Sequence, residues 1–144
     1  MKKQISIIRL NTLEEMADNL FLIQQLTPSL TAKKYLSYLS EMLPHRYFQI
    51  AALLDGKTVG VSGYWLATKF YCGRYLEIDN FVVDESCRSK GVGECMIKTL
   101  EEIAREHTCD VMMLDAYLQN TRAHTFYERQ HFKPKGSHFI KKLQ

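Results

Sequence analysis

Runs of apolar residues with the character of β-strands occur at the start and in the middle of the chain. Strands are predicted over residues 4–10, 47–54, 58–66 and 75–83. Asp55-Gly56 stands between the second and third runs, and this dipeptide favours a tight hairpin turn. A second turn is predicted near Cys72-Gly73. We therefore expect the last three of these strands to pair as an antiparallel meander.

Apolar residues recur at helical spacing between the first two predicted strands. Thr12 and Glu15 fit a capping box, and the stripe that follows contains Leu13, Met16, Ala17, Leu20 and Ile23. Thr27-Pro28 ends this first helix, and a second helix carries apolar residues at 35, 36, 39, 42 and 43 before Pro44 ends it. Tyr35 and Tyr38 are expected to pack on this helix rather than to contact a substrate.

The second half of the chain predicts a strand between two helices. The first helix follows residue 91, with a stripe of Val92, Met96, Leu100, Ile103 and Ala104. The apolar run 110–118 comes next, and because a helix connects it to the strand 75–83, the two strands should be parallel. Asn120 should cap a helix over 121–130, and short strands at 132–135 and 138–143 should form a compact hairpin around Gly136. This order predicts an α+β (mixed α/β) fold rather than a doubly wound sheet.

Length and composition indicate one globular domain spanning residues 1–144. Hydrophobic residues make up 46% and charged residues 24% of the chain, a composition that argues against a disordered chain. The net charge of +3 comes from 19 basic and 16 acidic residues, a balance that disfavours nucleic-acid binding. No apolar run approaches the roughly 18 residues of a membrane span, and no signal-peptide pattern follows Met1. We therefore expect a cytoplasmic protein with no membrane partner.

The four cysteines are expected to be reduced thiols. Cys72, Cys87, Cys95 and Cys109 contain no C-x-x-C pair, and a chain of this length does not need disulfides to fold. His107 lies close to Cys109 in the sequence, but further ligands at zinc-site spacing are lacking. No metal site is therefore expected.

The segment 88–93, Arg-Ser-Lys-Gly-Val-Gly, has the properties of a phosphate-binding turn. It joins a strand to a helix, so unpaired backbone N–H groups and the positive end of the helix dipole meet there. Gly91 and Gly93 let the backbone approach an anion closely, while Arg88 and Lys90 add positive charge. The dinucleotide fingerprint and the P-loop would both need a glycine where this chain has Met96, so both are excluded.

Two motifs resemble those of the GCN5-related N-acetyltransferases, the GNAT superfamily. Residues 88–93 have the pattern R-x-x-G-x-G, which is similar to the family signature Q/R-x-x-G-x-G/A. Residues 120–132 resemble the family segment N-x-x-A-x-x-F-Y-x-x-x-G-F. His131 stands where that segment has glycine, in a left-handed helix end that costs histidine more than glycine.

The resemblance implies a central, mostly antiparallel sheet with a splayed parallel strand pair and about four helices. It implies acetyl-coenzyme A as the cosubstrate, its pantetheine arm lying in the gap between the parted strands. The implied cofactor-binding residues are Phe81, Val82, Val83, Arg88, Ser89, Lys90, Gly91, Val92, Gly93, Asn120 and Phe126. Among them, the N–H of Val82 would polarise the thioester carbonyl.

The resemblance also implies the catalytic groups. Glu77 lies eleven residues before Arg88, the distance at which histone-type members place their glutamate base, and Asp79 shares its strand face. Tyr127 is expected to protonate the departing thiolate. Each of these residues also has a simpler interpretation: the acids as solvated or paired side chains at a strand end, and Tyr127 as a packed residue of its helix.

We therefore expect an enzyme that transfers an acetyl group from acetyl-coenzyme A to a primary amine, by direct attack in a ternary complex. The alternative is a non-catalytic sensor or regulatory module of the same fold that binds acyl-coenzyme A. A protein, a polyamine, an aminoglycoside and a small metabolite all present amines, and the sequence does not choose between them. The frequent dimers of the family make a homodimer a further possibility.

Overall fold

The computed structural model describes residues 4–144 and contains one five-stranded sheet. Its elements, in chain order, are β1 (Ile5–Leu10), α1 (Leu13–Ala17), α2 (Leu20–Leu26), α3 (Ala32–Met42), β2 (Tyr47–Leu54), β3 (Lys57–Lys69), β4 (Gly73–Val83), α4 (Val92–Glu106), β5 (Val111–Leu114) and α5 (Thr121–Arg129). The strand order is β1-β2-β3-β4-β5. The pairs β1-β2, β2-β3 and β3-β4 are antiparallel, and the pair β4-β5 is parallel. The predicted α+β fold with its antiparallel meander and parallel pair is confirmed.

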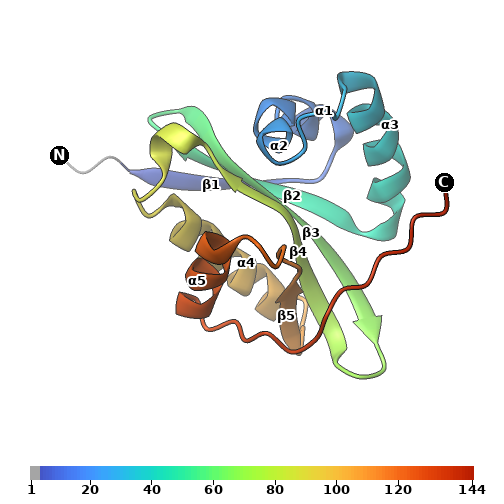
Figure 1. Cartoon of the computed structure of the whole chain (residues 1–144). Coiled ribbons are helices and arrows are strands. Elements are labelled where there is room, and N and C mark those ends of the chain that lie inside the picture. Colours follow the sequence, from blue (N-terminus) through green and yellow to red (C-terminus); the bar gives the residue numbers. More distant parts are fainter. Residues whose placement is uncertain (1–3) are drawn as a thin grey trace.

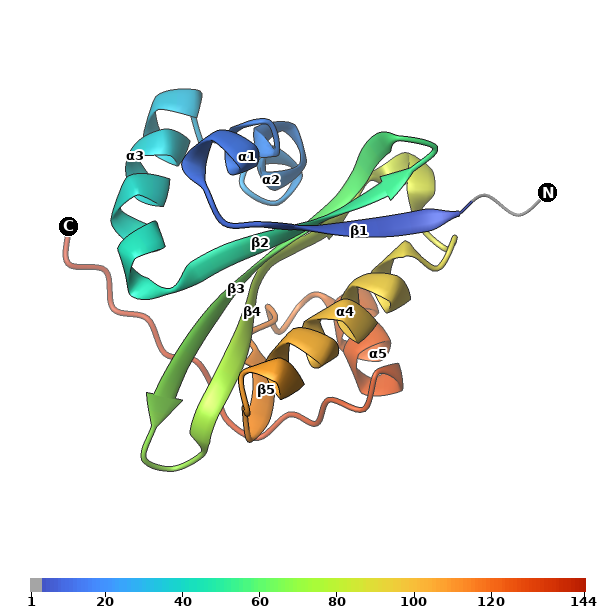
Figure 2. The same ribbon diagram turned by 180° about the vertical axis from the view of Figure 1, so that it is seen from behind.

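The helices cover the two faces of the sheet in separate groups. Helices α1, α2 and α3 lie on one face, and α4 and α5 lie on the other (Figures 1 and 2). Each group has its own apolar core against the sheet. In the described residues 4–144, no helix combines the length and the hydropathy that crossing a membrane requires.

The core beneath α4 follows the predicted helical stripe. The five predicted positions are buried, with 5% or less of each side chain exposed: Val92, Met96, Leu100, Ile103 and Ala104. Burying a side chain of the size of leucine or methionine stabilises a fold by about 1.5–3 kcal/mol. This stripe therefore holds the start of α4 firmly against the sheet, next to the predicted phosphate-binding turn.

The hairpin between β2 and β3 forms at the predicted dipeptide. Asp55 has φ 53° and Gly56 has φ 76°, so both central residues are left-handed. Two successive positive φ values are those of the type I′ turn, whose twist matches that of an antiparallel strand pair.

The first predicted helix is divided into two, so residues 4–144 contain five α-helices where about four were expected. The capping box of Thr12 and Glu15 is present at the start of α1. However, α1 ends at Ala17, and α2 begins only after Asn19. The Asn19 side chain is 4% exposed and donates a hydrogen bond from Nδ2 to Gln49 Oε1 at 2.8 Å. The break between α1 and α2 thus coincides with a buried hydrogen bond from Asn19 to Gln49 on β2, which the helical pattern of the sequence does not reveal.

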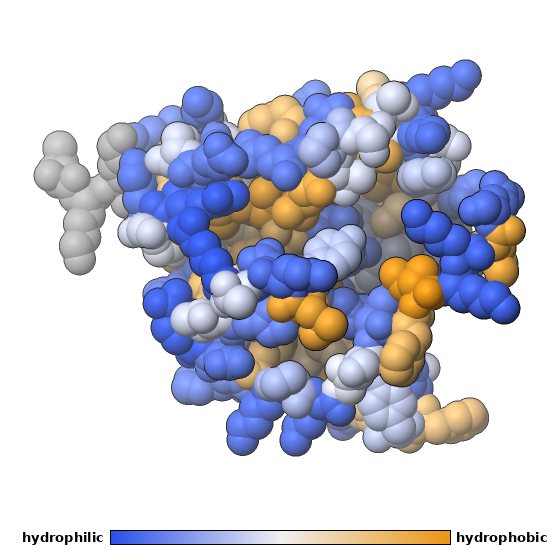
Figure 3. Space-filling model, viewed as in Figure 1, coloured by the Kyte–Doolittle hydropathy of each residue, from blue (hydrophilic) through white to orange (hydrophobic). Residues whose placement is uncertain are grey.

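The prediction of two short strands at 132–135 and 138–143 is wrong. No strand follows α5, and residues 133–144 are exposed. This C-terminal segment leaves α5, passes β5 and runs towards α3 (Figures 1 and 2). Its apolar side chains are exposed, and Phe139 is 93% exposed. Figure 3 shows apolar side chains at the surface among a majority of polar ones. The apolar residues of the segment favour a strand, but a strand must pair with another, and this segment pairs with no strand of the described chain, although the outer edge of β5 is open.

The helix end at His131 has the left-handed conformation that the glycine-containing family segment predicts. His131 has φ 70°, and its N–H donates to the carbonyl oxygen of Glu128 at 3.0 Å. The N–H of Phe132 donates to the carbonyl oxygen of Tyr127 at 3.0 Å. These bonds end α5 through a residue whose Cβ is strained in this conformation.

We predict that His131→Gly raises the free energy of unfolding by about 0.5–1 kcal/mol. Relief of left-handed strain contributes about 1–2 kcal/mol, and the greater freedom of glycine in the unfolded chain offsets part of it. Thermal denaturation should then show an increase in Tm of roughly 1–4 °C. The control is Gln130→Gly, because Gln130 has φ −88° and should lose stability. A lower Tm for His131→Gly would contradict the left-handed helix end.

Candidate cofactor and acceptor site

The turn before α4 presents backbone N–H groups without partners. Ser89 has φ 67° and Gly91 has φ 83°, so the chain twice takes the left-handed conformation before α4 begins at Val92. Within residues 4–144, the N–H groups of residues 88–93 donate no hydrogen bond to another group of the chain. Such groups at a helix N-terminus form a binding site for an anion.

The side chains of this turn divide between solvent and core. Arg88 and Lys90 are exposed, and neither forms an ion pair within the described chain. Val92 is 1% exposed and anchors the first turn of α4 in the core. A Cβ added at Gly93 would lie 3.1 Å from Phe126 Cζ, so glycine lets α5 approach α4 closely. Positive charge and free N–H groups therefore face outwards from a fixed helix end.

The two parallel strands separate beside this turn, as expected. Their last paired residues are Ile78 and Leu114, where β5 ends, while β4 continues to Val83. Beyond Ile78, no backbone hydrogen bond joins β4 to the described segment after Leu114. The predicted strand at 110–118 is thus shorter, at Val111–Leu114. The β5 side of residues 81–83 is therefore unpaired in the described chain, and this opening between β4 and β5 is called the gap below.

A bulge in β4 lies at the start of this gap. On β3, Val61 pairs with Val82 and Gly63 pairs with Asp79, so two steps along β3 match three along β4. Asn80 has φ 58°, the left-handed conformation that the extra residue adopts. A bulge changes which face the following side chains occupy. Asp79 and Asn80 consequently both line one cavity under α3, although they are consecutive in the strand.

Phe81, beyond the bulge, belongs to an aromatic cluster on the opposite face of the sheet. Its ring centroid lies 5.8 Å from that of Phe126 and 6.0 Å from that of Tyr127. Tyr127 also contacts Phe132, with ring centroids 5.8 Å apart. Val82 points the other way, into the core under α1–α3. The predicted cofactor residues Phe81, Gly93 and Phe126 are thus brought together with Tyr127.

Burial determines the ionisation of Tyr127. It raises the pKa of Tyr127 to about 12, so the hydroxyl group keeps its proton throughout the neutral range. Within the described chain, this hydroxyl group has no hydrogen-bond partner. Tyr127 therefore offers an unused hydrogen-bond donor next to Phe81.

The two predicted acids lie on the face opposite Tyr127, in different surroundings. Asp79 Oδ2 accepts a hydrogen bond from Trp65 Nε1 at 2.9 Å and lines the cavity. Burial raises the pKa of Glu77, and the negative charge of Asp115 raises it further. His138, from the C-terminal segment, acts in the opposite direction on Glu77 and lies 3.2 Å from Asp115, between Nδ1 and Oδ2.

Asn120 serves as a helix cap. Its Oδ1 accepts a hydrogen bond from the Ala123 N–H at 3.1 Å, at the start of α5. The capping prediction is confirmed, and the predicted contact of Asn120 with a cofactor stays a prediction.

Sequence reasoning missed several residues around the two acids. Asp115 directly follows β5, and its place at the carboxyl end of a parallel strand could have identified it. Trp65 and Asn80 could not be found in this way, because their contact with the site depends on the register of β3 and β4 and on the bulge. Tyr38 and Tyr47 line the cavity as well.

A cluster of free N–H groups beside two parted parallel strands defines a site for a ligand with an anionic group and an extended arm. This arrangement fits a transferase that uses a phosphorylated, thioester-carrying cofactor. Comparison with known proteins agrees: residues 11–132 match the family model described as "Acetyltransferase (GNAT) family". The chain therefore belongs to the GNAT family of acetyltransferases.

Individual relatives and structures extend this result. The chain is 26% identical over 124 residues to "Uncharacterized N-acetyltransferase YhdJ" of Bacillus subtilis (strain 168), covering 85% of this chain and 87% of that protein. Its fold is similar to that of the aminoglycoside N-acetyltransferase AAC(6')-Iy in complex with CoA, with a TM-score of 0.86, 18% identity, and coverage of 100% and 98%. The ribosomal-protein-alanine N-acetyltransferase of Brucella melitensis biovar Abortus 2308 gives a TM-score of 0.82 at 19% identity, with coverage of 98% and 100%.

Family membership defines the general activity. The chain is an N-acetyltransferase that depends on acetyl-coenzyme A, as its motifs indicated. The acceptors named for the two solved structures are chemically unlike each other, so the fold alone does not identify the amine.

Proposed function

We propose that the protein transfers the acetyl group of acetyl-coenzyme A directly to a primary amine while both substrates are bound. The observation that carries this proposal is the set of unpaired N–H groups at residues 88–93, next to the gap between β4 and β5. A diphosphate would accept hydrogen bonds from these groups, helped by the helix dipole and by Arg88 and Lys90. The thioester arm would then lie in the gap along residues 81–83.

In this proposal the cofactor and the amine meet where the sheet opens. The aromatic cluster of Phe81, Phe126 and Tyr127 lies on one face of the sheet, and Asp79 lies on the other. An amine held near Asp79 would attack the thioester carbon through the gap, forming a C–N bond and a tetrahedral oxyanion. A backbone N–H on the open side of β4 would stabilise that oxyanion. The N–H of Val82 faces β3 instead, because the N–H of Asp84, two residues further along the chain, donates to the carbonyl oxygen of Val59 at 2.8 Å. The C–S bond then breaks, and coenzyme A leaves as a thiolate.

The amine must lose a proton, because a primary amine with a pKa near 10.4 is about one part in a thousand free base at neutral pH. Asp79 or Glu77 would accept this proton, directly or through water. The raised pKa of Glu77 makes its carboxylate a stronger base than an ordinary glutamate.

Tyr127 would stabilise the departing thiolate by donating a hydrogen bond. With its pKa raised to about 12, the phenol is a weaker acid than a thiol near 8.5, so complete transfer of its proton would be uphill by about 5 kcal/mol. A hydrogen bond to an anion does not require that transfer. We therefore assign Tyr127 as a positioned donor rather than as the final source of the proton.

Tyr127→Phe should lower kcat by roughly 10- to 100-fold, the value of a lost hydrogen bond to a charged group. Acetyl-coenzyme A affinity, measured by calorimetry, should stay within about twofold, because diphosphate binding involves residues 88–93. Since the pKa of Tyr127 is about 12, its hydroxyl group is protonated below pH 10, and the wild type should show no fall in rate from this group between pH 7 and 10.

The matched control is Tyr117→Phe, because Tyr117 is 82% exposed and precedes the same helix. Its kcat should be unchanged. An unchanged kcat for Tyr127→Phe would remove the proposed role, and failure of the wild type to bind coenzyme A would overturn the proposed function as a whole.

We also propose that the chain forms a homodimer through its C-terminal segment. Residues 138–143 have the sequence character of a strand but no partner, with Phe139, Ile140 and Leu143 at least 75% exposed. The outer edge of β5 is open in the described chain. Around a two-fold axis, the segment of each copy could pair with β5 of the other, so that both edges and the apolar side chains are covered.

Light scattering of the full chain should then give twice the 16.8 kDa monomer mass. Phe139→Asp should shift the protein to the monomer, because it places a charge in the apolar contact. The control is Phe21→Asp on α2, where Phe21 is 47% exposed, and this variant should remain dimeric. A monomeric wild type, or a dimeric Phe139→Asp variant, would contradict the proposed pairing of the C-terminal segment with β5 of the second copy.

A further inference from the structure

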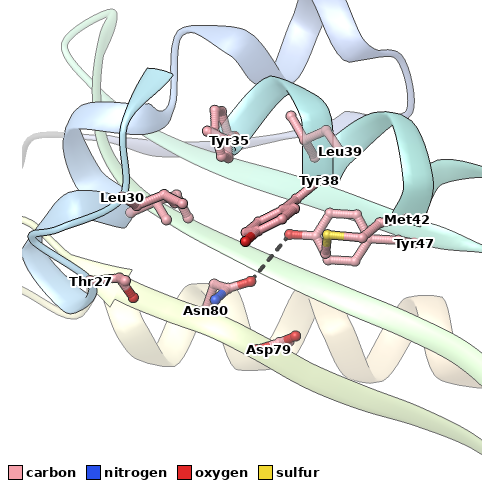
Figure 4. Close-up of a pocket in the computed structure, with 10 residues that line it drawn as sticks. Thr27, Leu30, Tyr35, Tyr38, Leu39, Met42, Tyr47, Asp79 and Asn80 are labelled. Atoms are coloured by element: carbon pink, nitrogen blue, oxygen red, sulfur yellow. Dashed lines mark hydrogen bonds between the residues drawn. The ribbon is translucent and has the colours of Figure 1, made fainter. Parts of the chain in front are cut away.

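A cavity of about 150 Å³ lies between the helical layer and the bulge of β4. Figure 4 shows Tyr38 reaching from α3 towards Asn80 on β4, with Leu30 on one side and Met42 and Tyr47 on the other. The full lining is Ile23, Thr27, Leu30, Tyr35, Tyr38, Leu39, Met42, Tyr47, Asp79 and Asn80. Most of this surface is aliphatic or aromatic. The cavity therefore favours a ligand with an apolar body.

Among the described residues that line the cavity, Asp79 is the single one with a formal charge. Its Oδ2 atom is held by Trp65 Nε1 at 2.9 Å, and no salt bridge within residues 4–144 includes Asp79. Within the part of the chain that the structure describes, the lining contains no lysine, arginine or histidine. A carboxylate at the edge of an apolar surface attracts one positive charge and offers no partner for a second.

The back of the cavity is held by a chain of buried hydrogen bonds. Asn19 Nδ2 donates to Gln49 Oε1 at 2.8 Å, and Gln49 Nε2 donates to Tyr47 Oη at 3.1 Å. Tyr47 Oη in turn donates to Asn80 Oδ1 at 3.4 Å (Figure 4). Asn19, Gln49 and Tyr47 are each no more than 4% exposed. A buried network whose members are satisfied is rigid, so the cavity is preformed rather than created by its ligand.

The bulge brings this network and the charge together. A Cβ at Gly63 would overlap the Tyr47 hydroxyl group, so the glycine opposite Asp79 gives Tyr47 room to reach Asn80. The left-handed Asn80 then accepts from Tyr47 beside Asp79. One wall of the cavity and its charge are thus built by the same irregularity in β4.

Volume limits what the cavity can hold. An apolar cavity of about 150 Å³ in another protein holds benzene, whereas sites for drug-sized ligands are roughly 300–1,000 Å³. A group with the size of one six-membered ring fits here. A molecule of several linked sugar rings, or the length of a polyamine, would extend out of the cavity and away from Asp79.

We propose that the acceptor is a small primary monoamine with an apolar body of about one ring, bound with its ammonium group at Asp79. This inference rests on the proposed function and narrows it. It also assigns removal of the amine proton to Asp79, because Glu77 does not line the cavity. The proton passes to the carboxylate, the nitrogen lone pair forms the new C–N bond, and the thiolate leaves as described above.

The test is a panel of amines at saturating acetyl-coenzyme A, read by thiol release and by mass spectrometry of the product. The panel contains benzylamine, spermidine, kanamycin and a peptide with one lysine. Benzylamine should have the highest kcat/KM, by roughly 10- to 100-fold, because that factor corresponds to burial of one ring. A higher value for spermidine, kanamycin or the peptide would overturn the inference while leaving the proposed function intact.

Leu30→Trp should fill the cavity and lower kcat/KM for benzylamine by roughly 10-fold or more, with coenzyme A affinity unchanged. The control is Leu26→Trp, since Leu26 is 49% exposed on α2 and does not line the cavity. Equal values for these two variants would place the acceptor elsewhere.

Asp79→Asn should lower kcat for benzylamine by roughly 100-fold, because the carboxylate that accepts the amine proton is lost. A larger loss of kcat in Glu77→Gln would contradict the assignment of proton removal to Asp79.

Calorimetry tests the cavity without turnover. Benzylamine should bind the wild type more tightly than benzyl alcohol, its uncharged analogue, and Asp79→Asn should remove this preference. If coenzyme A binds but no amine releases thiol, the proposed function fails, and with it the role of the ligand as an acceptor. The comparison of benzylamine with benzyl alcohol then still decides whether the cavity binds a small apolar monoamine. Equal affinities for benzylamine and benzyl alcohol would overturn this binding site as well.

Discussion

The site depends on backbone polar groups that have no partner within residues 4–144. A folded protein pairs nearly all its backbone N–H groups, in helices, in sheets or with water. Among the described residues, the N–H groups of residues 88–93 donate to no other group, and β4 continues past the last pair of the parallel ladder at Ile78 and Leu114. Both features occur where a sheet strand leads into α4. A ligand with a diphosphate and an extended, amide-containing arm satisfies both, which links the local geometry to acetyl-coenzyme A.

The bulge at Asn80 organises the other half of the site. It ends the regular alternation of β4, so that Phe81 joins the aromatic cluster of Tyr127 on one face while Asp79 lines the cavity on the other. The groups proposed for the leaving thiolate and for the attacking amine therefore lie on opposite sides of the opened sheet. This separation lets two substrates approach the same carbon atom without competing for space.

Local patterns predicted most of the fold, and contacts set by register decided the rest. The capping box at Thr12, the Asp55-Gly56 turn and the buried stripe of α4 each depend on a few neighbouring residues, and each is confirmed. The break before α2 involves Asn19 bonding to Gln49, thirty residues away, which no helical period reveals. The C-terminal strands failed for a related reason, because a β-prone segment becomes a strand only where an edge accepts it. Tyr127 and the turn at 88–93 were predicted by motif, and Asp79 by its place on the strand face of Glu77. Trp65, Asn80 and Asp115 depend instead on the three-dimensional arrangement of β3, β4 and β5.

The most direct test of the account is hydrogen exchange of the backbone amides at residues 88–93, followed by NMR with and without coenzyme A. Pantetheine, which has the thiol arm but no diphosphate, is the matched ligand. Coenzyme A should slow exchange of these amides, and pantetheine at equal occupancy should leave them unchanged, because the diphosphate is the predicted acceptor. If coenzyme A binds while these amides exchange as fast as in the free protein, the diphosphate is held elsewhere and the proposed placement of the cofactor is wrong.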